Sequence, residues 1–255
     1  MRSPFTFCLF LAASVVLMGQ SGFETDVFKT EGGVLRITFI GHASLLLHYQ
    51  QPNRPGDLAV YIDPDGRLAD YATLPKADLV LVTHAHGDHF DPRAIETLRQ
   101  SSTRIFVSAS CLPLPPGARV LKNGDQAESA GVIITAVPAY NIAHQRPDGR
   151  PFHPRGEGNG YVLAFPGRFT PGGGRVYIAG DTENIPEMKD LQAIAIAFLP
   201  MNLPYTMTPE MTALAARAFR PRILYPYHFS DTDPQRLVSL LRDEPAIEVR
   251  VRKMN

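Results

Sequence analysis

Three histidines and one aspartate fall within a stretch of six residues, and this stretch limits what the chain can fold into more than any other feature. They are His84, His86, Asp88 and His89. Imidazole nitrogens and carboxylate oxygens are the ligands that a borderline cation such as Zn²⁺ accepts, and crowding them together is costly unless such a cation collects them. The stretch therefore predicts a metal site rather than an exposed polar loop.

Two further candidate ligands, Asp181 and His228, come just after apolar runs, as His84 does. The run from Asp78 to Thr83, directly before His84, predicts a buried strand. Strand ends are where α/β proteins place their chemistry, and a carboxylate that ends a buried strand needs a cation or several donors nearby. We expect both residues at the site, the alternatives being a helix N-cap for Asp181 and a hydrogen-bonded core histidine for His228.

The stretch around His84 resembles the H-x-H-x-D-H signature of the metallo-β-lactamase-fold hydrolases. Within that superfamily, the chain is similar to the compact branch of metal-dependent hydrolases that is related to the ascorbate phosphate lactonases. Residues 137–141, 151–155 and 205–208 favour this branch. The resemblance covers roughly residues 33 to 250, and the other segments that match the superfamily, in its order, are Ile37–Ser44, Tyr61–Pro64, Ala179–Thr182 and Pro226–His228.

The resemblance implies an α/β fold of the α+β kind, a four-layer αβ/βα sandwich with the metal site at one edge between its sheets. It implies two metal ions, Zn²⁺ first, with Mn²⁺ or Fe²⁺ as alternatives. Ions about 3.5 to 4 Å apart would lower the pKa of a shared water toward about 7, supply a hydroxide nucleophile and polarise the bond under attack. The implied ligands are His84 and His86 for the first ion, Asp88, His89 and His228 for the second, and Asp181 between them, with Asp88 also orienting the nucleophile in catalysis.

The third ligand of the first ion should come from the loop after the predicted strand Val132 to Val137. His153 is favoured, because Pro151 and Pro154 on either side of Phe152 and His153 would hold the imidazole in a fixed extended pose. His144 lacks this restraint and is one alternative. The other alternative is an open position filled by water or by Asn141, whose neutral amide is a poor zinc ligand.

Other polar residues are predicted to support the ligands or to contact substrate. Asp63 should accept the second N–H of a ligand histidine, because a ligating imidazole normally donates its other N–H. His42 either lines the same edge or has a structural role in its turn. Arg155 and Tyr205 are candidates for contact with the substrate.

The segment Asn141 to Gly160 is predicted to be a long ordered loop over the site, with a solvated surface loop as the alternative. Its arginines, Arg146, Arg150 and Arg155, indicate an anionic substrate, because guanidinium pairs with phosphate and carboxylate. The expected function is hydrolysis of a small, anionic ester, lactone, phosphodiester or amide. A metal-binding envelope module that has lost catalysis is the alternative, and a redox di-iron site is a third hypothesis.

Residues 1–21 have the order of a signal peptide: Arg2, then an apolar run, then Gly19 and Ser21. This order predicts export to the periplasm or the outside with cleavage after Ser21. The run is short for a membrane span of about 20 residues, so an N-terminal anchor is the alternative. In the remaining 22–255, Cys111 is the only cysteine, which predicts a buried thiol and no disulfide.

Residues 22–255 are predicted to form one hydrolase domain, with strands dominating its first half and strands alternating with helices in its second. The formal net charge is +0, which gives no reason to expect a nucleic-acid or anionic membrane partner. The expected partner is a small-molecule substrate, and the oligomeric state is not predicted.

Three helices are predicted, because Asp91, Thr208 and Asp233 each place an N-cap before a proline at the first helical position. The predicted strands are Val34–Tyr49, as two strands or one bent strand, Leu58–Ile62, Asp78–Thr83, Arg104–Ser108, Val132–Val137, Tyr161–Phe165, Arg175–Ala179, Ile194–Leu199 and Ile223–Tyr227.

Overall fold

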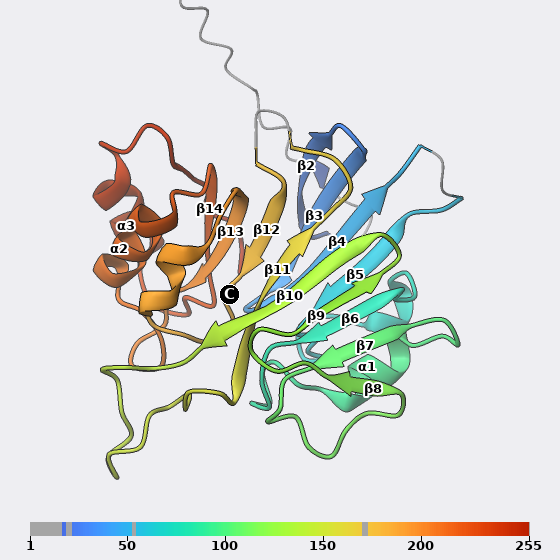
Figure 1. Ribbon diagram of the computed structural model, residues 1–255, viewed down its shortest axis with the longest axis horizontal. Coiled ribbons are helices and arrows are strands. Elements are labelled where there is room, and N and C mark those ends of the chain that lie inside the picture. The colour runs from blue at the N-terminus through green and yellow to red at the C-terminus, as the bar shows by residue number, and fades with distance from the viewer. Residues whose placement is uncertain (1–16, 19–21, 53–54, 170–172, 255) are drawn as a thin grey trace, which may run out of the picture.

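Two β-sheets pack against each other in the computed structural model, which describes residues 17–18, 22–52, 55–169 and 173–254 (Figure 1). The strands of the first sheet lie in sequence order: β1 Leu17–Met18, β2 Glu24–Thr30, β3 Gly33–Gly41, β4 Ser44–Gln50, β5 Leu58–Ile62, β6 Leu79–Val82, β7 Arg104–Val107 and β8 Ala118–Val120. The second sheet, in spatial order, contains β15 Glu248–Val249, β14 Ile223–Tyr227, β13 Ile194–Pro200, β12 Arg175–Ile178, β11 Gly158–Ala164, β10 Val132–Ala139 and β9 Gln126–Ser129.

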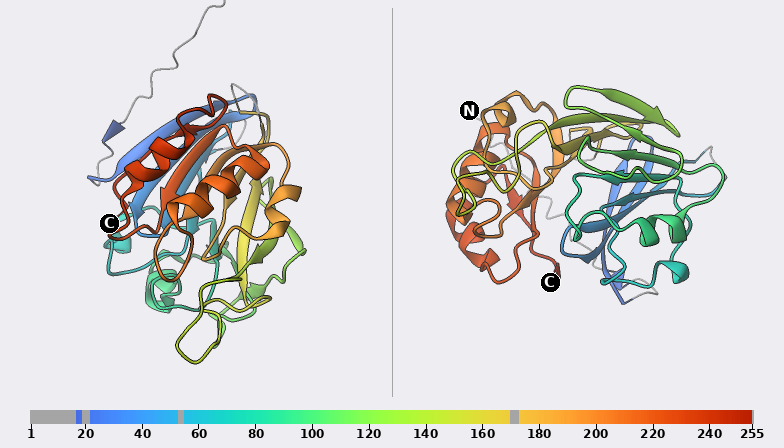
Figure 2. Two further views of the ribbon diagram at one scale, coloured as in Figure 1. Left: turned by 90° about the vertical axis from the view of Figure 1, so that its left-hand side faces the viewer. Right: turned by 90° about the horizontal axis from the view of Figure 1, so that it is seen from below.

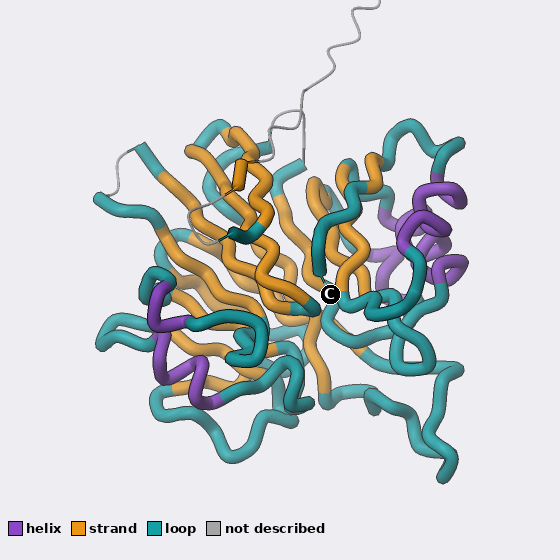
Figure 3. Tube along the Cα trace, turned by 180° about the vertical axis from the view of Figure 1, so that it is seen from behind, coloured by secondary structure: helices purple, strands orange, loops and turns teal. Residues whose placement is uncertain are grey.

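Short helices cover the outer face of each sheet (Figures 2 and 3). Helix α1 (Pro92–Leu98) packs on the first sheet, and α2 (Pro209–Phe219) and α3 (Pro234–Leu241) pack on the second. Two single 3₁₀ turns, η1 (Tyr71–Thr73) and η2 (Pro186–Asp190), lie in connecting segments. The layers therefore run helix, sheet, sheet, helix, as the predicted sandwich requires.

Each α-helix begins where the sequence predicts. Asp91 accepts hydrogen bonds from the N–H groups of Arg93 and Ala94, and Thr208 and Asp233 cap α2 and α3 in the same way. A proline follows each cap, where its missing N–H costs nothing. Within the described part of the chain, no helix is both long enough and apolar enough to cross a membrane. The predicted signal peptide lies outside the described residues, apart from residues 17 and 18.

Both faces of the first sheet are buried. In β5, Leu58, Val60 and Ile62 belong to the core shared with the second sheet, whereas Ala59 and Tyr61 pack on the α1 side. Successive side chains of a strand point to opposite faces, so a sheet that is covered on both sides needs apolar residues at every position. This is why its central strands are continuous apolar runs in the sequence.

The predicted strands are present, and their bounds differ from the prediction by at most three residues. The segment Val34–Tyr49 forms two strands, not one bent strand. The pattern did not indicate β1, β2, β8, β9 or β15. In β2 the reason is Asp26, a buried carboxylate that interrupts the apolar pattern and lies 2.7 Å from the guanidinium of Arg252 near the other end of the chain.

The predicted loop over residues 141–160 is too long at its C-terminal end. Strand β11 already begins at Gly158, and residues Gly158 to Gly160 pair with Ala139 to Val137 of β10. Two glycines in three residues weaken a strand pattern, which concealed this pairing. The remaining loop leaves β10 and extends away from both sheets before it returns (Figure 1).

The candidate ligands follow strands whose carboxyl ends lie at the same edge. Strands β5 and β6 run parallel in the first sheet, and β12, β13 and β14 run parallel in the second. Parallel neighbours end on the same side of their sheet. The chain leaves β6, β12 and β14 directly into the segments that carry His84, Asp181 and His228.

Candidate metal centre

The loop after β6 carries the histidine motif and turns sharply at Gly87. The N–H groups of His89 and Phe90 both donate to the carbonyl oxygen of His86, at 3.0 and 2.9 Å. This turn separates the motif into two parts. His84 and His86 join one group of candidate ligands, and Asp88 and His89 join another.

The first group consists of His84, His86, His153 and Asp181, whose ligand atoms all lie within 4.8 Å of one another. His86 Nδ1 is 3.0 Å from His84 Nε2 and 3.2 Å from His153 Nε2. His153 Nε2 is also 3.2 Å from Asp181 Oδ2. Three imidazoles and a carboxylate facing a common point form a donor set suited to Zn²⁺.

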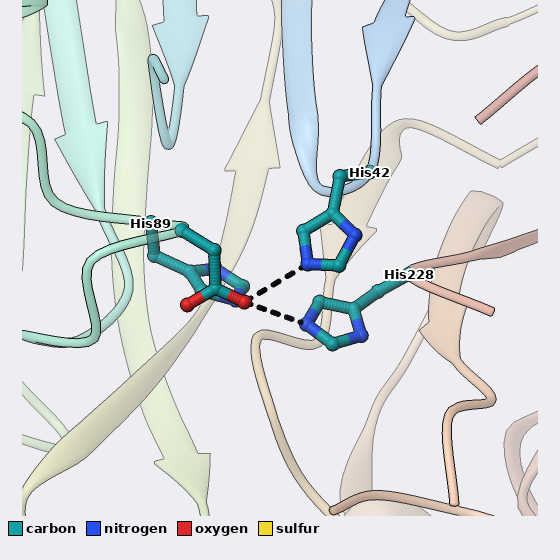
Figure 4. A group of neighbouring side chains, drawn as sticks. His42, His89 and His228 are labelled. Carbon is teal, nitrogen blue, oxygen red and sulfur yellow. Dashed lines mark hydrogen bonds and ion pairs between the residues drawn. The ribbon is translucent and has the colours of Figure 1, made fainter. Parts of the chain in front are cut away.

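The second group consists of His42, Asp88, His89 and His228. Asp88 Oδ2 lies 2.9 Å from His42 Nε2, 3.5 Å from His228 Nε2 and 3.7 Å from His89 Nε2. Figure 4 shows the rings of His42 and His228 side by side, with dashed lines from both to one carboxylate oxygen. Their ring centroids are 3.8 Å apart.

Asp181 faces both groups. Its Oδ1 is 3.4 Å from His89 Nε2, and its Oδ2 is 3.4 Å from His228 Nε2. His89 Nε2, His228 Nε2 and Asp181 Oδ1 are buried and have no hydrogen-bond partner among the described residues. Leaving such atoms unpaired costs about 1 to 3 kcal/mol each, which metal ligation would remove. These unpaired atoms and the donor types fit a pair of metal ions on either side of Asp181.

The electrostatics of the group favour a bound cation. Burial lowers the pKa of His84 well below its usual value, and the ring of His89 lowers it further. Burial alone would raise the pKa of Asp181, but His228 and His89 outweigh it and hold this pKa well below its usual range. Against its own burial, Asp181 and Asp63 raise the pKa of His89 to about 9. Asp181 and Asp63 thus keep a proton on the buried ring of His89. A divalent cation would balance the negative charge of these carboxylates in place of that proton.

Other side chains orient the imidazoles through their second nitrogens. Asp63 Oδ2 is 2.8 Å from His89 Nδ1, as the sequence predicts for Asp63. Thr83 places its hydroxyl 3.1 Å from His84 Nδ1 and donates it to Asp63. The prediction missed Thr83, although a polar residue between an apolar run and the first histidine is a usable signal. Fixing one nitrogen in this way presents the other to the metal.

The structure brings His153, and neither alternative, into the first group. Asn141 Oδ1 accepts hydrogen bonds from His153 N at 2.7 Å and from His153 Nδ1 at 2.8 Å, so Asn141 holds the ring instead of replacing it. His144 turns away, with its Nδ1 2.8 Å from a carboxylate oxygen of Glu183. Asn141 and His144 therefore lie outside the first group, contrary to the two alternatives.

Glu183 explains the path of this loop and was not predicted. Its buried carboxylate accepts the N–H groups of Ile142, Ala143 and His144 at 2.7 to 2.8 Å. It also accepts a hydrogen bond from the side-chain amide of Asn141 at 3.1 Å. These bonds outweigh the burial of Glu183 and lower its pKa. One carboxylate thus anchors the start of the loop that carries His153.

His42 lines the edge that carries the candidate ligands, one of the two roles expected for it, with its Nε2 inside the second group. Its backbone has a φ of 51°, a left-handed conformation that costs a residue other than glycine about 1 kcal/mol or more. Two backbone hydrogen bonds support it: His42 N–H donates to Met254 at 2.6 Å, and His42 C=O accepts from His228 N at 2.9 Å. The turn prediction is right, and the turn aims the ring at Asp88.

Arg155 and Tyr205, the candidates for contact with the substrate, lie outside both groups of candidate ligands. Arg155 pairs with Glu187 at 2.6 Å, outside both groups. Tyr205 is half-exposed and packs its ring against Phe152. The other loop arginines also have partners: Arg150 pairs with Asp148 at 2.7 Å, and Arg146 lies over the ring of Phe152. The arginines of the loop thus give no evidence for an anionic substrate.

Comparison with known proteins decides the family. A family model described as a beta-lactamase superfamily domain matches residues 36–228. The chain belongs to this superfamily. A UPF0173 metal-dependent hydrolase of Nitratidesulfovibrio vulgaris is 32% identical over 216 residues, covering 76% of this chain and 80% of the relative. The chain is therefore also a member of this metal-dependent hydrolase family, as the motif predicts.

Solved structures give the same result. A protein from Parabacteroides distasonis, described as a metal-dependent hydrolase, is 48% identical with a TM-score of 0.81, and the match covers 91% of this chain and 100% of that one. Igni18, a metallo hydrolase from Ignicoccus hospitalis, is 25% identical with a TM-score of 0.65, covering 87% and 96%. The predicted metallo-β-lactamase fold is thereby confirmed.

Proposed function

We propose that this member of the metal-dependent hydrolases binds two Zn²⁺ ions, one in each group of ligands, and cleaves a small ester, lactone, phosphodiester or amide. The observation that carries the proposal is the position of Asp181 between the two groups, with His89 Nε2, His228 Nε2 and its own Oδ1 buried and unpaired among the described residues. Mn²⁺ and Fe²⁺ accept the same donors and are alternatives to Zn²⁺.

The proposed binding follows the two groups, except that His42 would support Asp88 instead of holding an ion. His84, His86 and His153 would hold the first ion, His89 and His228 with Asp88 would hold the second, and Asp181 would contact both. Bound there, the ions would lower the pKa of water and polarise the carbonyl or phosphoryl oxygen under attack. Cys111 is a poor candidate for a nucleophile, because it is buried and burial raises the pKa of its thiol to about 11.

Asp88 and His42 are the members of the second group that a substrate can reach. Their side chains are 35% and 21% exposed, whereas those of His89 and His228 are 0% and 3% exposed. Asp88 would orient the attacking water, because one of its oxygens is engaged by the histidines while the other remains for hydrogen bonding. His42, whose Nε2 lies 2.9 Å from Asp88 Oδ2, would hold that carboxylate in place.

The proposal is tested by removing metal from the purified protein with a chelator and titrating Zn²⁺ back. We expect two equivalents to bind, a lower melting temperature without metal, and turnover of at least one ester, lactone, phosphodiester or amide only when metal is present. Zn²⁺ binding without turnover of any substrate in such a panel would instead support a metal-binding module that has lost catalysis.

We also propose that the protein is exported and that its physiological partner is a small-molecule substrate. The support for export is the order of charged, apolar and small residues over 1–21. The support for a small substrate is the restricted space beside the first group of ligands, described next.

A further inference from the structure

A small cavity lies beside the first group of ligands. All four members of that group line it, and its volume is about 70 Å³. On this scale one water needs about 10 to 15 Å³, so the cavity has room for about five non-hydrogen atoms. A group bound there would be in contact with the ligands of the first ion.

The walls of this cavity are mainly apolar. Ala85, Ala139, Phe152 and Pro154 contribute to them. Phe152 is held as a wall from two sides: the ring of Tyr205 packs against it at 5.0 Å, and the guanidinium of Arg146 lies 5.2 Å from its centroid. The aromatic ring that lines the cavity is therefore restrained.

Apart from a bound ion, the charged side chains that line the cavity are acidic. No lysine or arginine lines the cavity among the described residues, whereas Asp181 and Glu157 do. Glu157 is exposed as well as lining the cavity, which places it at the boundary with solvent. The carboxylate of Glu157 has no hydrogen bond or ion pair within the described part of the chain. An anionic group would meet an unpaired carboxylate on its way in.

The other side of the metal centre is different. His42 and Asp88 of the second group line a wide groove of about 710 Å³, together with Arg67. The groove is about ten times larger than the cavity. A substrate that spans both ions must therefore place its small part against the first group and its large or polar part against the second.

We propose that the cavity is the subsite for a short, uncharged alkyl group on the carbonyl or phosphoryl centre under attack, limited in length by Phe152 and in charge by Glu157. This inference rests on the proposed function, because it assigns the cavity to the substrate of the same metal centre. The substrate class is thus a short-chain acyl compound or alkyl phosphoester whose larger part lies in the groove.

The test uses alkyl hydroxamates, which bind metal through their oxygens, titrated calorimetrically into the full chain loaded with Zn²⁺. Each methylene buried should tighten Kd about fourfold. We expect this gain to stop when the chain reaches about five non-hydrogen atoms. A hydroxamate of the same length that ends in a carboxylate should bind on the order of fivefold more weakly than its uncharged counterpart.

Two substitutions with matched controls test whether Phe152 limits the length and Glu157 the charge of the bound group. Phe152→Ala should move the length limit to longer chains, whereas Ile142→Ala, an exposed apolar truncation in the same loop, should leave it unchanged. Glu157→Gln should remove the penalty against the carboxylate, whereas Glu128→Gln, at an exposed position on β9, should not.

Three results would overturn the inference. Affinity independent of chain length, tighter binding of the carboxylate, or an unchanged length limit in Phe152→Ala would each do so while leaving the proposed function intact. If no hydroxamate of any length binds the Zn²⁺-treated protein, the metal centre itself is absent, and the proposed function fails together with this inference.

Discussion

Replacing Asn141 with alanine should weaken the first metal site selectively. Asn141 Oδ1 accepts from both the backbone N–H and the Nδ1 of His153, so the substitution removes both bonds that orient this ring. At about 0.5 to 1.5 kcal/mol for each bond, the loss corresponds to roughly 5- to 150-fold in affinity if all of it falls on the metal-bound state. Supports of ligand histidines typically contribute 10- to 100-fold, which lies within this range.

The assay is competition with a chromophoric chelator, which gives two stepwise Zn²⁺ constants for the full chain. In Asn141→Ala, one of the two association constants for Zn²⁺ should fall 10- to 100-fold while the other changes less than threefold. His144→Ala is the matched control, because it removes a neighbouring side chain of Glu183 but leaves Asn141 and His153 in place. Unchanged constants in Asn141→Ala, or loss of a whole equivalent in His144→Ala, would refute this assignment of the third ligand.

Three further results are expected. Asp88→Ala should reduce kcat far more than it changes KM, since orienting the nucleophile matters in the transition state, and steady-state kinetics with near-normal kcat would remove Asp88 from the mechanism. Arg155→Ala should change kcat/KM less than twofold, because its guanidinium is engaged by Glu187. A tenfold loss of kcat/KM would instead show that Arg155 contacts the substrate. The exported protein should begin near Gly22. An intact mass that retains Met1 would support the alternative, in which residues 1–21 stay attached as an N-terminal anchor.

The parts of the centre that follow short-range patterns were predictable from the sequence. His84, His86, Asp88 and His89 are adjacent in the chain, and their donor types alone indicate a cation. The strand ends and helix caps also follow local rules, which is why the three capped prolines begin helices as predicted.

The rest depends on contacts between distant segments. The choice of His153 over His144 follows from Glu183, whose buried carboxylate fixes the loop but lies about forty residues further along the chain. The orientation of His42 depends on the carbonyl of Met254 at the opposite end of the chain. Neither contact leaves a signal in the local pattern of the segment that it positions.

The loop arginines also depend on contacts that the local sequence does not reveal. Their composition favoured an anionic substrate, but a guanidinium can as well be satisfied within the chain. Arg150 and Arg155 pair with Asp148 and Glu187, and Arg146 lies over Phe152. Composition indicates which groups are available, and only the folded contacts decide which of them remain free for a ligand.

The most direct test of a shared metal centre is anomalous diffraction from crystals of the Zn²⁺-loaded protein, recorded on both sides of the zinc edge. We expect two zinc peaks about 3.5 to 4 Å apart. One should lie among His84, His86 and His153, and the other among Asp88, His89 and His228, with Asp181 contacting both. A single peak at saturating Zn²⁺, or two peaks without Asp181 between them, would contradict this expectation.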